Sequence, residues 1–71
     1  MHDRHLCIVM PEFAGGGAQR IGVNLANFYS RAGIAVTVLV FRDQGPLRQD
    51  LLPSVRVASL DSASSTPYRK I

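Results

Sequence analysis

His-Leu-Cys-Ile-Val-Met occupies residues 5–10, and after a short loop Gly15-Gly16-Gly17 leads into an amphipathic segment. The first stretch is a continuous apolar run closed by Pro11, which is typical of a buried β-strand. A glycine run lets the backbone approach a ligand closely, and the first N–H groups of a following helix have no partner within it. Ligands of open α/β sheets bind at the carboxyl ends of the strands, so this junction predicts an anion site, above all for phosphate.

Residues 18–32 predict an amphipathic helix. Its apolar residues recur at helical spacing at Ile21, Leu25, Phe28 and Ala32, and Ala26 and Tyr29 lie beside them. Gly33 follows the last turn, as a glycine commonly does after a helix, and Arg31 stands where the helix dipole favours a cation.

Three further segments complete the pattern. Residues 35–41 predict a second strand rich in β-branched side chains, 46–52 a short helix that begins at a proline, and 55–58 a short third strand. The Ser-rich stretch 61–71 predicts a loop or a disordered tail. The order β-α-β-α-β predicts an α/β fold with a three-stranded parallel sheet, as part of a Rossmann-like three-layer domain.

Right-handed crossovers that run in one direction place both helices on the same face of the sheet. The second strand, however, is apolar on both of its faces, as in sheets covered on both sides. We therefore expect 1–71 to be an incomplete domain of a longer protein. With one sheet face uncovered, the chain is expected to bind a hydrophobic dye or to self-associate.

The composition narrows the classes of function. The chain has 71 residues and a net charge of +3, with its Lys and Arg scattered, so it favours anionic partners weakly and has no nucleic-acid footprint. A single cysteine excludes an internal disulfide framework, and Cys7 is expected to be a small buried hydrophobe. No apolar run approaches the ~20 residues of a membrane span, and no signal-peptide pattern precedes the first strand. These features predict a cytoplasmic protein.

Two nucleotide-binding motifs contain closely spaced glycines of this kind, the dinucleotide fingerprint and the P-loop. The dinucleotide fingerprint G-x-G-x-x-G is broken because Arg20 replaces its third glycine. Arg42, rather than an acidic residue that would bind a ribose, follows the second strand, and Asp43 comes late. Two alternative functions of the chain stay open. One is a dinucleotide-binding oxidoreductase domain, and the other is a non-catalytic fragment whose open sheet face binds a partner. A P-loop is excluded, because no Gly-Lys-Ser/Thr follows.

A second interpretation comes from resemblance, over roughly residues 5–60. The elements that carry it follow one another as Ile8-Val9-Met10-Pro11, Gly16-Gly17-Ala18-Gln19-Arg20, Val23-Asn24-Leu25-Ala26, Ala32-Gly33, Val36-Thr37-Val38-Leu39, Gly45-Pro46-Leu47-Arg48 and Leu52-Pro53-Ser54-Val55-Arg56-Val57. In this order they resemble the start of a GT-B-fold glycosyltransferase of the family-4 type. The chain would then be the first half of the N-terminal domain of such an enzyme.

The resemblance implies a sugar transfer, with retention and without a bound metal or other cofactor, from a nucleotide-diphosphate-sugar donor to a glycan, lipid or small-molecule acceptor. Two Rossmann-like domains would face each other across a cleft, so the missing C-terminal domain is required and this chain alone is expected to be inactive. Gly16 and Gly17 would line the cleft beside the donor diphosphate, with Gln19 and Arg20 at the same edge. Many relatives have Glu where this chain has Gln19. Parts outside this sequence could attach such an enzyme to the inner face of a membrane.

The chemistry of Arg20 agrees with this picture. A cation in the first turn of a helix is disfavoured by about 0.3–1 kcal/mol, and a bound diphosphate would reverse that penalty through a bidentate contact. We therefore assign Gly15, Gly16, Gly17 and Arg20 to the donor diphosphate and Gln19 to the acceptor side, with no catalytic residue and no metal ligand. Glu12 is expected to be a solvated loop residue. On an extended segment His2 and His5 would point to opposite sides, which disfavours a metal pair.

Overall fold

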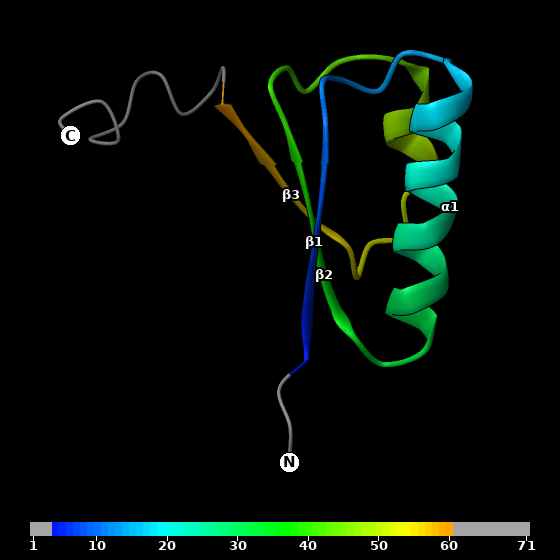
Figure 1. Cartoon of the computed structure of the whole chain (residues 1–71), viewed down its shortest axis with the longest axis vertical. Helices are drawn as coiled ribbons and strands as arrows, with labels where there is room; N and C mark the ends of the chain where they lie inside the picture. The colour runs from blue at the N-terminus through cyan, green and yellow to red at the C-terminus, as the bar shows by residue number, and fades with distance from the viewer. Residues whose placement is uncertain (1–3, 61–71) are drawn as a thin grey trace, which may run out of the picture.

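The computed structural model describes residues 4–60, and they form a small α/β domain (Figure 1). The elements are β1 (His5–Met10), α1 (Gly17–Arg31), β2 (Ala35–Val40), the 3-10 helix η1 (Pro46–Asp50) and β3 (Arg56–Ser59). Both strand pairs are parallel, in the order β1-β2-β3. The predicted parallel sheet and β-α-β arrangement are therefore confirmed. The predicted tail, 61–71, lies outside the described residues.

The second helix differs from the sequence prediction. Residues 46–50 form a 3-10 helix, and Leu51 is already extended with φ −76° and ψ 141°. A segment of five residues is little more than one turn, so the cooperative hydrogen bonding that favours an α-helix has no room to develop. Within residues 4–60 no helix has the length and the apolar character needed to span a membrane.

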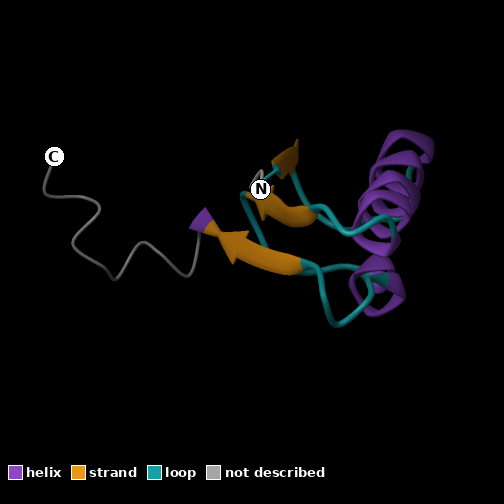
Figure 2. Ribbon diagram, turned by 90° about the horizontal axis from the view of Figure 1, so that it is seen from below, coloured by secondary structure: helices purple, strands orange, loops and turns teal. Residues whose placement is uncertain are grey.

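The helices α1 and η1 lie on the same side of the sheet, as expected from the crossovers (Figure 2). Strand register runs from His5↔Ala35 to Met10↔Val40, so the two strands present alternate residues to the same face. The helix side of the sheet and the two helices enclose the core, whose buried members are Met10, Phe13, Val23, Ala26, Val36, Val38, Val40, Leu47 and Val55. The described residues thus form two layers, one sheet and one helical layer.

The large apolar residues of α1 do not face this core. Gly22, Val23 and Ala26 are its buried residues, whereas Ile21 is 60% and Phe28 62% exposed. Small residues let the helix approach the sheet closely: a Cβ on Gly22 would come within 2.6 Å of Met10 Cε. The larger side chains are consequently left on the outside. Of the apolar residues predicted from spacing, Ala26 is buried and Tyr29 packs against the core, whereas Ile21, Leu25 and Phe28 lie on the surface.

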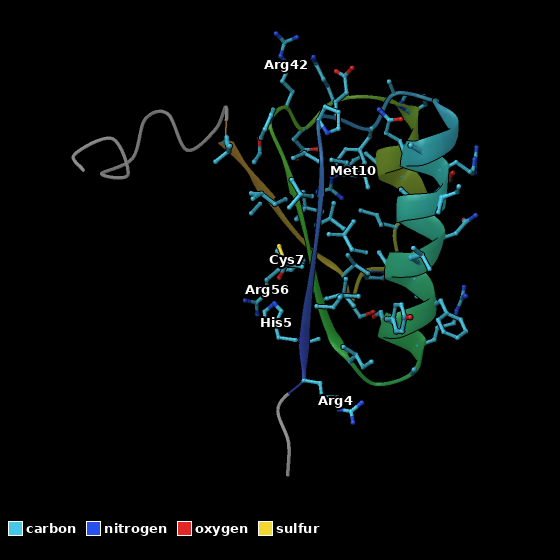
Figure 3. All side chains as sticks on the ribbon, in the orientation of Figure 1. Arg4, His5, Cys7, Met10, Arg42 and Arg56 are labelled. Atoms are coloured by element: carbon cyan, nitrogen blue, oxygen red, sulfur yellow. The ribbon has the colours of Figure 1, made fainter. Side chains whose placement is uncertain are left out.

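Cys7 is exposed, contrary to the sequence prediction. Along β1 the residues Leu6, Ile8 and Met10 turn toward the helical layer, and the alternation that follows from strand geometry sends Cys7 to the opposite face. Figure 3 shows Cys7, His5 and Arg56 on the side of the sheet away from α1. No element among residues 4–60 covers that face, and it is called the open face below.

Candidate functional site

The carboxyl edge of the sheet is built by two loops, residues 11–16 after β1 and 41–45 after β2. Backbone hydrogen bonds join them. Phe41 N and Arg42 N donate to Pro11 O at 3.0 and 3.1 Å, and Phe13 N donates to Gln44 O at 2.9 Å. Because these contacts involve the backbone, they hold the β1–α1 loop in place regardless of most side chains.

Phe13 and Gly45 anchor this edge, and the sequence analysis missed both. The Phe13 side chain is fully buried, and its carbonyl accepts a 3.0 Å bond from Leu47 N. Gly45 has φ +121°, and a Cβ there would come within 2.2 Å of the Phe13 carbonyl. Only glycine fits such a position. The Gly45-Pro46 pair before a helical turn was the available signal, but its contact with Phe13 is not visible in the sequence.

The glycine run lies on the surface at the start of α1. Gly16 is the N-cap residue, with φ −69° and ψ 159°, and no side chain caps the helix. Its own N–H donates to Ala14 O at 2.9 Å, and its carbonyl accepts the first helical bond from Arg20 N at 3.0 Å. The N–H groups of the first turn, which have no intrahelical partner, therefore lack a side-chain cap as well.

The space around the run is open. A Cβ on Gly15 or Gly17 would meet nothing within 4 Å, and neither residue has a positive φ. The loop conformation thus does not require glycine at these two positions. Because these glycines have no side chains, a ligand has unobstructed access to the backbone at the N-terminal end of α1.

Gln19 is half-buried, and its amide lies over the N-cap. A Cβ built on Gly16 would come within 2.6 Å of Gln19 Oε1. The structure therefore brings Gln19 and Gly16 together, as the sequence analysis expected of residues at one edge. Rotation of this flexible side chain would be needed for a ligand to contact the Gly16 backbone from that direction.

Arg20 does not point freely into solvent. Its Nη1 lies 3.4 Å from Asp50 Oδ2, at the end of η1, and both side chains are about half exposed. Ion pairs this exposed contribute only about 0–1 kcal/mol, so a phosphate could displace the carboxylate at small cost. The Arg20 side chain thus pairs with Asp50 and makes no hydrogen bond to the glycine run.

A second cation, Arg42, lies at the same edge of the sheet as the glycine run (Figure 3). No carboxylate among residues 4–60 lies within 4.0 Å of it, whereas Asp43 pairs with Arg48 at 3.0 Å. Asp43 is the acid that a ribose-binding role would need, and it is already engaged. Glu12, half-buried in the β1–α1 loop, has no cationic partner among the described residues.

Residues 4–60 contain no group of three or more His, Cys, Asp or Glu side chains that could hold a metal ion. His5 Nε2 lies 3.0 Å from Thr37 Oγ1 on the open face, far along β1 from the glycine run. His2 lies outside the described residues, so its relation to His5 is not defined.

Comparison of the chain with protein-family models, with curated proteins and with solved structures found no significant match. The fold and the residues of the carboxyl edge are therefore the basis for any functional assignment, together with the resemblance in sequence described above.

Proposed function

We propose that the chain is the N-terminal part of the first Rossmann-like domain of a GT-B glycosyltransferase, and that its glycine run binds the diphosphate of the nucleotide-sugar donor. A donor-binding C-terminal domain completes the site. The acceptor is a glycan, lipid or small molecule, and the enzyme acts in the cytoplasm or at the inner face of a membrane. No catalytic side chain is assigned to this chain.

One observation carries the proposal: α1 begins without a side-chain cap, beside a glycine run with open space at Gly15 and Gly17. Unpaired N–H groups and the positive end of the helix dipole favour an anion at that point. The site lies at the carboxyl edge of a parallel sheet, where ligands of such folds bind.

The charges nearby fit a phosphorylated leaving group better than a dinucleotide. Arg42 follows β2 in the position where an NAD-type domain has its ribose-binding acid. Arg20 can exchange Asp50 for a phosphate, since an Arg–phosphate contact is bidentate and stronger than an exposed ion pair. Cations and N–H groups at this edge would stabilise negative charge as it builds up on the departing diphosphate.

The test is a titration of the 71-residue chain with UDP, GDP, ADP and inorganic pyrophosphate, followed by backbone NMR. We expect the largest amide shifts at residues 15–20 and at Arg42, and weaker effects elsewhere. Shifts confined to residues far from the glycine run, or none with any of the four probes, would contradict the proposal.

Two variants examine Arg20 separately. Asp50→Asn removes the competing carboxylate, so diphosphate binding should tighten by up to about fivefold, the value of an exposed ion pair. Arg20→Ala should weaken binding instead. If both variants bind as the natural chain does, Arg20 has no part in the site even where the glycine run does. The chain alone should transfer no sugar, and measurable turnover would refute its assignment as a partial enzyme.

A further inference from the structure

The β1–α1 loop, residues 11–16, is attached to the core by one side chain. Phe13 is fully buried and belongs to the core between the sheet and the helical layer. The other residues of this loop are exposed or half-buried. The position of the loop on the core therefore depends on Phe13.

The backbone of Phe13 is held as well, by the segment that follows β2. Its N–H donates to Gln44 O at 2.9 Å, and its carbonyl accepts from Leu47 N at 3.0 Å. Gly45 lies between these two partners, so close to the loop that a Cβ there would come within 2.6 Å of Ala14 N. Figure 1 shows the two segments running from the sheet to the helical layer. The loop cannot move without displacing residues 44–47.

The helix after the glycine run is held by the same short element. Leu47, which bonds to Phe13, and Asp50 both belong to η1. Asp50 accepts two hydrogen bonds from α1, one from Arg20 to its carboxylate at 3.4 Å and one from Asn27 to its backbone carbonyl at 2.9 Å. Thus η1 contacts both the loop that precedes the glycine run and the helix that follows it. The three glycines lie between two fixed points.

We propose that Phe13 is a positioning residue for the diphosphate site, because it anchors the loop to the core and to η1 and so holds the glycine run in its binding conformation. This inference rests on the proposed function. Glycine loses more conformational freedom on ordering than any other residue, and a loop that is mobile before binding must be ordered by its ligand. A loop that is already ordered avoids this cost and binds more tightly. Phe13 acts through the backbone and contacts no ligand atom.

The substitution Phe13→Leu tests this role. It keeps a buried apolar side chain but fills less of the core, so the loop loses part of its anchor. We expect the dissociation constant of inorganic pyrophosphate, measured by isothermal titration calorimetry on the 71-residue chain, to rise at least about tenfold. A tenfold change corresponds to about 1.4 kcal/mol, the order of the cost of fixing one backbone residue.

Val36→Ala is the matched control. Val36 is also buried in the core, but it lies at the amino end of β2, at the edge of the sheet opposite the glycine run. Both substitutions remove buried apolar volume and should lower the melting temperature, whereas only Phe13→Leu should weaken binding. Circular dichroism checks that both variants are folded at the temperature of the titration. If Phe13→Leu does not fold, Phe13→Met, which changes the volume of the side chain less, takes its place.

A second measurement needs no ligand. The heteronuclear ¹⁵N NOE of the Gly15, Gly16 and Gly17 amides reports how rigid the run is before binding. Phe13→Leu should lower these values relative to the natural chain, and Val36→Ala should leave them unchanged.

The outcomes separate this inference from the function on which it rests. If Phe13→Leu binds pyrophosphate within about twofold of the natural chain, the positioning role is overturned. An equal loss of affinity in Val36→Ala, or NOE values that Phe13→Leu does not change, overturns it too. Absence of pyrophosphate binding by the natural chain would instead contradict the diphosphate site itself, and this inference with it.

Discussion

Replacement of Gly17 by proline would remove one proposed phosphate ligand and leave the fold intact. Gly17 is the first residue of α1, where proline is well tolerated because the N–H has no helical partner. The residue before a proline must be extended, and Gly16 already has φ −69° and ψ 159°. The substitution also restricts the unfolded chain, which favours a stability gain of about 0.4–1 kcal/mol.

The magnitude follows from the one donor that is lost. A hydrogen bond to a charged group contributes about 1.5–3 kcal/mol, so the dissociation constant of a bound diphosphate should rise about 10- to 100-fold. Isothermal titration calorimetry with UDP and pyrophosphate measures this change, and a thermal melt confirms that the variant is folded. Gly17→Ala is the control, because it keeps the N–H and its Cβ meets nothing within 4 Å.

The outcome separates two roles for the glycine run. Weakened binding with Gly17→Pro and near-normal binding with Gly17→Ala would identify the backbone N–H as the ligand. Equal affinity of Gly17→Pro and the natural chain would refute the reasoning, since the phosphate could not then depend on that N–H. Loss of binding with both variants would instead point to space for the ligand as the role of this residue.

Three further predictions concern the scaffold. Gly45→Ala should destabilise the fold by more than the ~1–3 kcal/mol of backbone strain, because its Cβ also meets the Phe13 carbonyl. In the same thermal melts Gly15→Ala, whose Cβ meets nothing within 4 Å, should show no loss of stability. Asn27→Ala removes two hydrogen bonds of 2.9 Å, one from Asn27 Nδ2 to Asp50 O and one from Leu52 N to Asn27 Oδ1. Its free energy of unfolding, measured by urea titration, should fall by about 1–3 kcal/mol. Asn27→Asp should lose less stability, because it keeps the acceptor for Leu52 N. Cys7 should react with a thiol reagent in the native state nearly as fast as in denaturant, and slow native labelling would show that another element covers the open face.

The sequence predicted the strands and their order because each strand is a compact apolar run between strong turn signals. It did not predict which side of α1 is buried. That helix carries two sets of apolar residues, one with large and one with small side chains, and periodicity alone favours burial of the large side chains. In the structure the small side chains are buried instead, because Gly22 and Ala26 allow α1 to approach the sheet closely. The spacing was thus right about the helix and about Ala26 and Tyr29, which lie in or against the core. It was wrong about Ile21, Leu25 and Phe28, which are exposed.

The position of the candidate site in the fold was predictable from the sequence, but its side-chain contacts were not. The glycine run and the start of α1 follow from local sequence, and both are found where expected at the carboxyl edge. The Arg20–Asp50 ion pair and the fit of Gly45 against Phe13 join residues about thirty positions apart. Such contacts depend on how the helices settle on the sheet, and a single sequence carries no local signal for them.

Some glycines of this chain are required by the fold, and others are not. Gly45 and Gly33 have φ values of +121° and +90°, and Gly22 lies against Met10, so the backbone or the packing accounts for each of these three. Gly15 and Gly17 have neither constraint, although alanine there would restrict the unfolded chain and increase stability by about 0.4–1 kcal/mol. A feature that costs stability and serves no packing purpose is most simply explained by a ligand. A double variant, Gly15→Ala with Gly17→Ala, should therefore melt at a higher temperature; a lower melting temperature would show that the run has a structural role after all.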